Sequence, residues 1–389
     1  MGLPNNLYRM SFERHLDLRT ALAKKSHFMF GPRGVGKTTL IRETLADDYQ
    51  VISLLRSQER LRLTEDPSHL RKMLVPRKSG VVIDEIQKVP ELLDEVQDLI
   101  EEQKIRFLLT GSSARKLKRH SANLLGGRAR VLEMFGVTHA ESPTIPLERK
   151  LQYGSLPAVL SSDDPWDDLK AYADTYLKEE IEEEAAVRNL GQFVRFLKVA
   201  ALQSGQLLNY AAVSSDSGVS ETTVRAYFEI LKDTLIGTLL EPWRESKKRK
   251  AIQTAKFFFF DPGVQAALID RQTLHRESVE FGTALEHWVL HELRAYRSIH
   301  RTHASLTYWR STAGHEVDFC LGDRVAIEVK STRRLTERHF HGLKALREEK
   351  IFKRFVMVSF DATTRRWDEH FECWPVEEFL IALSEGEFD

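Results

Sequence analysis

The sequence predicts an α/β fold, with a parallel sheet in the N-terminal part and a second α/β domain at the C-terminal end. Three patterns lead to this prediction. An apolar run at 28–30 precedes a glycine-rich turn and then helix-forming residues, which is the order strand, turn, helix. A run of β-branched residues at 80–83 has the continuous apolar character of a buried parallel strand. Residues 316–330 alternate between apolar and charged side chains, as half-buried strands do.

The turn after the first predicted strand fits the phosphate-binding pattern G-x-x-x-x-G-K-[ST] at every fixed position. Its glycines let backbone N–H groups surround phosphates, Lys37 would reach the β- and γ-phosphate oxygens, and the Thr38 hydroxyl would bind Mg²⁺. The alternative is a chance glycine-rich turn, and the flanking strand and helix argue against it. We therefore predict that ATP, with Mg²⁺, binds to Gly31, Pro32, Arg33, Gly34, Val35, Gly36, Lys37, Thr38 and Thr39.

Two carboxylates follow the predicted strand at 80–83. Because parallel strands end at one edge of a sheet, Asp84 and Glu85 should face the phosphate-binding loop. Asp84 would hold Mg²⁺ through water, and Glu85 would polarise the water that attacks the γ-phosphate. The plainer alternative is that both acids cap the helix that follows.

Several motifs together resemble a large prokaryotic family of AAA-type ATPases whose C-terminal half is a domain of unknown function. The resemblance covers nearly the whole chain, although only the loop and the acid pair are chemically specific. Ser155 departs from the family pattern, which usually has glycine there. The motifs are the phosphate-binding loop and the runs 84–87, 110–112, 127–128 and 154–157.

This resemblance implies further catalytic residues. A polar residue where the strand 106–110 ends would sense the γ-phosphate, and Thr110 or Ser112 is the candidate; a helix cap explains Ser112 or Ser113 equally well. An arginine from a neighbouring subunit would stabilise the transferred phosphoryl group, with Arg128 the first choice and Arg115 the second. Ordinary surface arginines are the alternative. An arginine supplied by a neighbour implies self-association into a ring, which we expect to be a hexamer.

The composition is that of a globular protein with several domains. The chain has 389 residues, 42% hydrophobic and 29% charged, and its 57 basic and 57 acidic side chains cancel. No global field therefore attracts nucleic acid or membranes. Two cysteines exclude a disulfide framework, and we expect a cytoplasmic protein without a signal peptide, a membrane span or a lipid anchor.

Residues 201–270 look like a winged helix. Two short helices are predicted around a turn at 218–219, and Ser220 would cap the second. The N-terminal turns of that helix would contact DNA through Thr222, Thr223 and Arg225. A basic run before the strand 256–260 would form the wing and neutralise phosphates through Lys247, Lys248, Arg249 and Lys250. The alternative is that the winged helix binds protein.

In the C-terminal domain, alternation within two strands places Asp318 opposite Val317 and Phe319, and Glu328 with Lys330 opposite Ile327 and Val329. Two carboxylates and a lysine are what metal-assisted phosphodiester cleavage requires. With Glu286 on a preceding helix, their order resembles the PD-(D/E)xK nuclease fold, with Val317 in place of the proline. That resemblance makes Asp318 and Glu328 metal ligands, Lys330 catalytic and Glu286 auxiliary. The alternative is a structural ion-pair cluster.

The chain is thus predicted to contain four regions: a P-loop AAA+ ATPase core at 1–145, a helical lid or connector at 146–200, a winged helix at 201–270 and a nuclease-like domain at 271–389. The predicted function is ATP hydrolysis by a ring protein that acts on DNA, with a candidate Mg²⁺-dependent nuclease domain. The alternative is an ATP-gated switch that binds a protein partner, in which the C-terminal domain is a non-catalytic scaffold.

Overall fold

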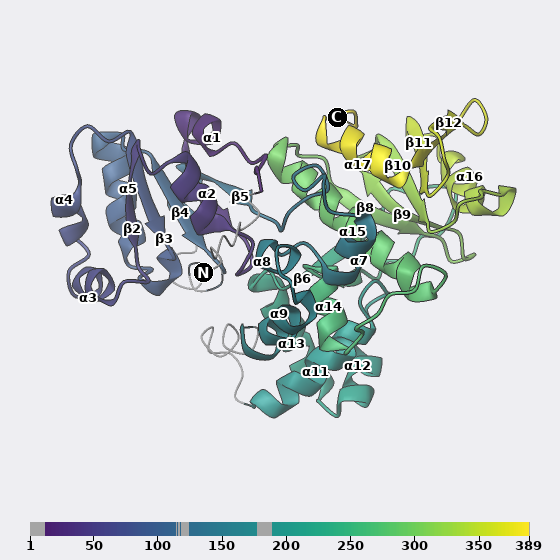
Figure 1. Ribbon diagram of the computed structural model, residues 1–389, viewed down its shortest axis with the longest axis horizontal. Coiled ribbons are helices and arrows are strands. Elements are labelled where there is room, and N and C mark those ends of the chain that lie inside the picture. Colours follow the sequence, from purple (N-terminus) through teal and green to yellow (C-terminus); the bar gives the residue numbers. More distant parts are fainter. Residues whose placement is uncertain (1–11, 114, 116, 118–123, 177–188, 389) are drawn as a thin grey trace, which may run out of the picture.

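The computed structural model describes residues 12–113, 115, 117, 124–176 and 189–388 (Figure 1). A sheet flanked by helices forms the N-terminal part, helices occupy the middle of the chain, and a second sheet lies toward the C-terminus (Figure 1). Among the described residues, no helix combines the length and apolar character needed to cross a membrane.

The N-terminal sheet has five strands in the order β2-β3-β4-β1-β5, all paired in parallel, which confirms the predicted parallel sheet. The apolar runs of β1, β3 and β4 are buried along their whole length, as strands covered on both faces must be. The strands are β1 (Ser26–Phe30), β2 (Tyr49–Ser53), β3 (Gly80–Asp84), β4 (Phe107–Gly111) and β5 (Ala129–Glu133). The helices are α1 (Leu18–Lys24), α2 (Lys37–Thr44), α3 (Ser57–Glu65), α4 (His69–Met73) and α5 (Leu92–Gln103), with 3-10 turns η1 (Ile86–Lys88) and η2 (Leu124–Gly127).

The middle of the chain is mainly helical, and side-chain caps fix where its helices begin. Asn189, Asn209, Ser220 and Asp261 each accept a hydrogen bond from a backbone N–H in the first turn of the following helix. The predicted cap at Ser220 is therefore confirmed. The helices are α7 (Leu147–Tyr153), α8 (Pro157–Leu160), α9 (Pro165–Ala171), the π-helical η3 (Tyr172–Tyr176), α11 (Leu190–Leu202), α12 (Tyr210–Ser217), α13 (Glu221–Asp233) and α14 (Pro262–Leu268).

The second sheet has eight strands in the order β12-β13-β11-β10-β9-β8-β6-β7. Two of its strands, β6 and β7, lie within the predicted winged-helix region at 201–270. β6 pairs with β7 on one side and with β8 on the other. The sheet therefore crosses the boundary that we predicted at residue 270. Its strands are β6 (Gly237–Pro242), β7 (Lys256–Phe259), β8 (Leu306–Arg310), β9 (Glu316–Leu321), β10 (Val325–Lys330), β11 (Arg354–Ser359), β12 (Arg365–Arg366) and β13 (Phe371–Pro375).

Three helices accompany this sheet, and α15 is the longest of them. It has 21 residues, and its buried side chains pack against both the sheet and the N-terminal domain. The helices are α15 (Val279–Ile299), α16 (His341–Arg347) and α17 (Val376–Ser384), with the 3-10 turn η4 (Glu337–Phe340) before α16.

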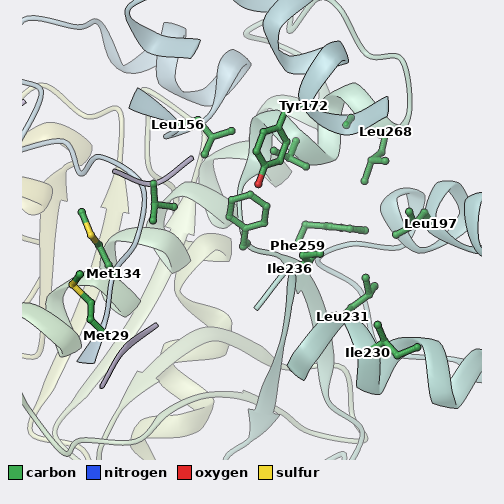
Figure 2. Packing of buried hydrophobic residues seen from close by; sticks show 14 of the residues in the cluster. Met29, Met134, Leu156, Tyr172, Leu197, Ile230, Leu231, Ile236, Phe259 and Leu268 are labelled. Carbon is green, nitrogen blue, oxygen red and sulfur yellow. The ribbon is translucent and has the colours of Figure 1, made fainter. Parts of the chain in front are cut away.

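One apolar core continues from the N-terminal sheet into the middle helices. Met29 and Met134 belong to the N-terminal side, Leu156 and Tyr172 lie between the two regions, and Leu231 lies on α13 (Figure 2). Because these side chains belong to one buried cluster, the N-terminal domain and the middle helices share an interior.

The segment between β6 and β7 lies against the C-terminal domain. The Glu349 carboxylate accepts the backbone N–H groups of Lys247, Lys248 and Arg249 at 2.8–3.3 Å. The Ile252 N–H donates to the Arg310 carbonyl at 2.8 Å. The predicted wing tip is thus fixed through its backbone to the C-terminal domain.

We predict that Glu349→Gln lowers the free energy of unfolding by about 1–3 kcal/mol, because the segment loses a charged acceptor. Urea unfolding at pH 7 measures this. Glu348→Gln is the matched control, since Glu348 is an exposed neighbour that pairs with Arg249, and should change stability by less than about 1 kcal/mol.

We also predict that the difference in the free energy of unfolding between wild type and Glu349→Gln depends on pH. Burial acts to raise the pKa of Glu349, but the Ser246 hydroxyl and the backbone N–H groups outweigh it and hold the pKa below its ordinary value. The stabilisation is therefore present above the unfolded-state pKa of about 4.3 and is lost as the pH falls through the lowered folded-state pKa. A deficit of the Gln variant that stays constant on acidification would contradict this.

Candidate functional site

The predicted phosphate-binding loop lies between the end of β1 and the start of α2. Gly36 has φ 96°, a left-handed conformation that favours glycine. A Cβ on Gly31 would lie 2.3 Å from the Met134 carbonyl oxygen, so this position also requires glycine. The Lys37 ammonium is buried and donates to the carbonyl oxygens of Gly31 and Pro32 at 2.6 and 3.0 Å. The loop therefore folds around the lysine that would meet the phosphates.

The predicted acid pair lies at the same edge of the sheet, at the end of β3. Because β4 lies between β1 and β3, Thr110 lies beside both the loop strand and the acid strand. Its hydroxyl donates to the Asp84 carboxylate at 2.6 Å, and the Glu85 N–H donates to the same hydroxyl at 3.3 Å. Glu85 adopts φ 62°, an uncommon conformation for a residue other than glycine. Thr110 thus connects both acids to the loop edge.

The structure places the two candidate arginines differently. Arg128 immediately precedes β5, at the opposite end of the sheet from the loop, and pairs with Glu101. Five residues of strand separate Arg128 from the edge where the loop lies, a span of about 17 Å. Arg128 therefore does not belong to the phosphate site of its own chain. Arg115 follows β4, and its N–H donates to the Ser113 hydroxyl at 3.0 Å.

The predicted C-terminal constellation is only partly assembled. The Lys330 ammonium lies 2.5 Å from a Glu328 oxygen and 3.9 Å from an Asp318 oxygen, and Asp318 also accepts the Val329 N–H at 2.8 Å. Burial, and then the neighbouring Asp318, raise the pKa of Glu328. The second Glu328 oxygen, Oε2, is buried without a hydrogen-bond partner among the described residues. Asp318, Glu328 and Lys330 thus meet as predicted.

Glu286 instead belongs to an ion pair that the sequence analysis missed. The Lys256 ammonium, from β7, lies 3.0 Å from Glu286 and 2.7 Å from Glu316, and its side chain is only 5% exposed. Burial alone acts to lower the pKa of Lys256, but Glu286, Asp318 and Glu316 raise it. Within the described part of the chain, no three His, Cys, Asp or Glu side chains are arranged to hold a metal ion. Glu286 is thus held by Lys256, and it lies near enough to Asp318 that burial and then the Asp318 charge raise its pKa to about 7.

The two carboxylates that remain still suit Mg²⁺. This ion often binds through one or two carboxylates and keeps several waters for substrate phosphates to replace. The unpartnered Glu328 oxygen is an acceptor that such a cation would satisfy.

The candidate nucleic-acid residues lie on α13 and in the segment between β6 and β7. On α13, Thr222 is exposed, Thr223 donates its N–H to the Ser220 cap, and Arg225 pairs with Glu221 at 2.6 Å. The Arg225 guanidinium also lies 4.0 Å from the centre of the Tyr210 ring. In the segment before β7, Arg249 pairs with Glu348 at 2.8 Å.

The remaining wing cations, Lys247, Lys248 and Lys250, are exposed and have no ion-pair partner among the described residues. Of the predicted basic run, these three ammonium groups are therefore available to bind phosphates.

Comparison with known proteins identifies the N-terminal part. Residues 23–142 match the family model of the AAA domain. This part of the chain is an AAA-type P-loop domain. The rest matches two models described only as domains of unknown function, DUF8612 at 146–275 and DUF4143 at 281–379.

Three bacterial relatives of the chain are all uncharacterized proteins. Those of Mycobacterium tuberculosis and Mycobacterium bovis are 27% identical over 323 residues, which is 78% of this chain and 69% of each relative. A protein of Haemophilus influenzae is 22% identical over 236 residues, 53% of this chain and 58% of the relative. The AAA domain indicates ATPase activity, and the relatives add nothing more specific.

Around the AAA site, the sequence analysis missed two residues that contact its predicted groups. The Gln87 amide donates to the carboxylate of Glu85 and to the hydroxyl of Ser112, the latter at 3.1 Å. The Tyr172 hydroxyl donates to the Arg33 carbonyl of the loop at 3.0 Å. The run 84–87 contained a signal for Gln87, but Tyr172 lies 139 residues from Arg33, and no local pattern predicts that contact.

We predict that Lys256→Met lowers the free energy of unfolding by about 3–5 kcal/mol, because Glu286 and Glu316 lose their buried counter-charge. Adding Glu286→Gln to this variant should recover part of the loss, since it removes one uncompensated carboxylate. Urea unfolding measures both changes.

The control is Arg310→Met. It removes a more exposed partner of Glu316 and should cost less than about 1 kcal/mol. If the Lys256 variant were as stable as this control, Lys256 would not be the principal counter-charge of the cluster.

Proposed function

We propose that this protein hydrolyses ATP with Mg²⁺ and uses the reaction to act on DNA. The observation on which the proposal rests is the meeting of the phosphate-binding loop, the acid pair and Thr110 at one edge of a parallel sheet. Ligand sites in open α/β sheets lie at this edge.

In this proposal each group of the AAA site has one task. Lys37 exchanges its carbonyl partners for the β- and γ-phosphate oxygens, and Glu85 orients and polarises the attacking water. Thr110 fixes the position of Asp84 and responds to the γ-phosphate. Thr38 and Asp84 supply the hydroxyl and carboxylate oxygens that Mg²⁺ prefers. When bound, Mg²⁺ neutralises charge on the phosphates.

We further propose that the active form is a ring, expected to be a hexamer, in which Arg128 serves the site of a neighbouring subunit. Support comes from the position of Arg128, about 17 Å from the edge of its own sheet where the loop lies. At that distance Arg128 cannot contact a phosphate bound to the loop of its own subunit in this conformation. Arg115 remains the second candidate.

For DNA, the three available wing lysines favour contact with phosphates, whereas Arg225 would first have to leave Glu221. The unpartnered Glu328 oxygen favours a cation beside Asp318 and Lys330, and hence Mg²⁺-dependent cleavage of DNA. The alternative function is an ATP-gated switch that binds a protein, with this domain as a scaffold.

We predict that Glu85→Gln binds ATP about as tightly as wild type but turns it over at least about 100-fold more slowly, because the water loses its general base. Steady-state turnover and equilibrium binding of an ATP analogue measure the two effects. Glu91→Gln, a nearby acid outside the site, is the control. Normal turnover in the Glu85 variant would remove Glu85 from the mechanism.

DNA action has its own test. Duplex, single-stranded and branched DNA should stimulate turnover, and binding should weaken as salt rises. Replacing Lys247, Lys248 and Lys250 by Ala should reduce the slope of log K against log salt concentration by the amount expected for about three phosphate contacts. Cleavage in Mg²⁺ or Mn²⁺ that Asp318→Ala abolishes would establish the nuclease. If none of these DNAs changed the rate of ATP turnover and none was cleaved, the ATP-gated switch that binds a protein would be favoured.

A further inference from the structure

We propose that Arg14, held by Glu141, is a positioning residue for the nucleotide: it fixes the Val35–Gly36 peptide so that the Gly36 N–H faces the phosphates. This inference rests on the proposed ATP binding at the loop. It assigns a role to a residue upstream of the matched AAA domain and 17 positions before the loop begins.

The Arg14 guanidinium bridges the loop and the segment that follows β5. It donates to the Val35 carbonyl at 2.7 Å and to the Phe135 carbonyl at 2.6 Å. Its Nε donates to the Glu141 carboxylate at 3.0 Å. The Arg14 and Glu141 side chains are only 9% and 1% exposed, so solvent screens this pair weakly. A planar guanidinium can hold these acceptors at once, which lysine cannot.

The Glu141 carboxylate is itself fixed. One of its oxygens accepts the His15 N–H at 2.7 Å, and the other accepts the Thr138 N–H at 3.0 Å in addition to Arg14. With both oxygens occupied, Glu141 determines where the guanidinium lies, and Arg14 transmits that position to the loop.

The consequence for the phosphates follows from peptide geometry. In a planar trans peptide the C=O and N–H bonds point in opposite directions. Because the Val35 carbonyl points toward Arg14, the N–H of the next residue, Gly36, points away from it. Gly36 lies at φ 96° and directly precedes α2, so its peptide has freedom to rotate unless something holds the carbonyl. Arg14 supplies that restraint.

Arg14 acts through the loop and not on the reacting atoms, so it should contribute equally to ground-state and transition-state binding of ATP. Loss of such uniform binding raises KM and leaves kcat unchanged. A residue that only stabilises the fold would lower the melting temperature and leave KM as it was.

The experiment compares full-length wild type, Arg14→Met, Arg14→Lys and Glu141→Gln, with Arg19→Met as the matched control. Arg19 lies in the same N-terminal region, but its partner Asp48 is on the surface. Steady-state ATP turnover gives KM and kcat, titration with a fluorescent ADP analogue gives Kd, and thermal unfolding without nucleotide checks the fold.

We expect Arg14→Met to raise KM and Kd by about 10- to 100-fold, with kcat within about threefold of wild type. Arg14→Lys should keep most of this defect, Glu141→Gln should show a smaller one, and Arg19→Met should show none. If Arg14→Met does not fold, Arg14→Lys provides the test. Unchanged KM and Kd in a folded Arg14 variant would overturn the inference. Failure of wild type itself to bind ADP would instead refute the proposed ATP site.

Discussion

The structure depends most on the segment 133–142, which begins at the last residue of β5 and contacts three parts of the molecule. The Met134 N–H donates to the Phe30 carbonyl at 2.7 Å, next to the phosphate-binding loop. Arg14 links the segment to the phosphate-binding loop, because it donates hydrogen bonds to the carbonyls of both Phe135 and Val35. On its other side, the segment meets α15: the Ser298 hydroxyl donates to the Glu133 carbonyl at 2.5 Å, and the His139 N–H donates to a Glu292 oxygen at 2.6 Å. The proposed nucleotide site and the C-terminal domain thus contact one stretch of backbone.

Buried polar groups surround the segment 133–142. Hydrogen bonds need particular distances and directions, so these groups fix the position of the segment more tightly than apolar packing does. The Lys150 ammonium is buried and donates to the Ser142 carbonyl at 2.8 Å and lies 3.1 Å from His139 Nδ1. Burial lowers the pKa of Lys150 to about 8 and that of His139 to about 4, and it raises the pKa of Glu292 to about 8. Displacement of α15 from this segment would leave Glu292 without the His139 N–H and the Ser298 hydroxyl without the Glu133 carbonyl, which is costly for buried polar groups.

The sequence predicted those parts of the site that depend on neighbours in the chain. The loop, the acid pair after β3 and the Ser220 cap each follow from a local pattern, and the structure has the expected strand, turn or helix at each. Contacts across long separations could not be predicted. Arg14 and Glu141 are 127 residues apart. Lys256 contacts Glu286 because β7 joins the second sheet, whose strands the predicted boundary at residue 270 assigned to two different regions. Such contacts depend on how the sheet is assembled, which periodicity does not reveal.

We infer that a nucleotide bound at the loop also stabilises the segment 133–142 and α15, because Arg14 joins the loop to that segment and Glu292 and Ser298 join the segment to α15. Hydrogen exchange with and without a non-hydrolysable ATP analogue tests it directly, because exchange reports local opening of each backbone stretch. We expect slower exchange in 31–44, in 133–142 and in the part of α15 that carries Glu292 and Ser298. Protection confined to 31–44, with 133–142 and α15 unchanged, would contradict it.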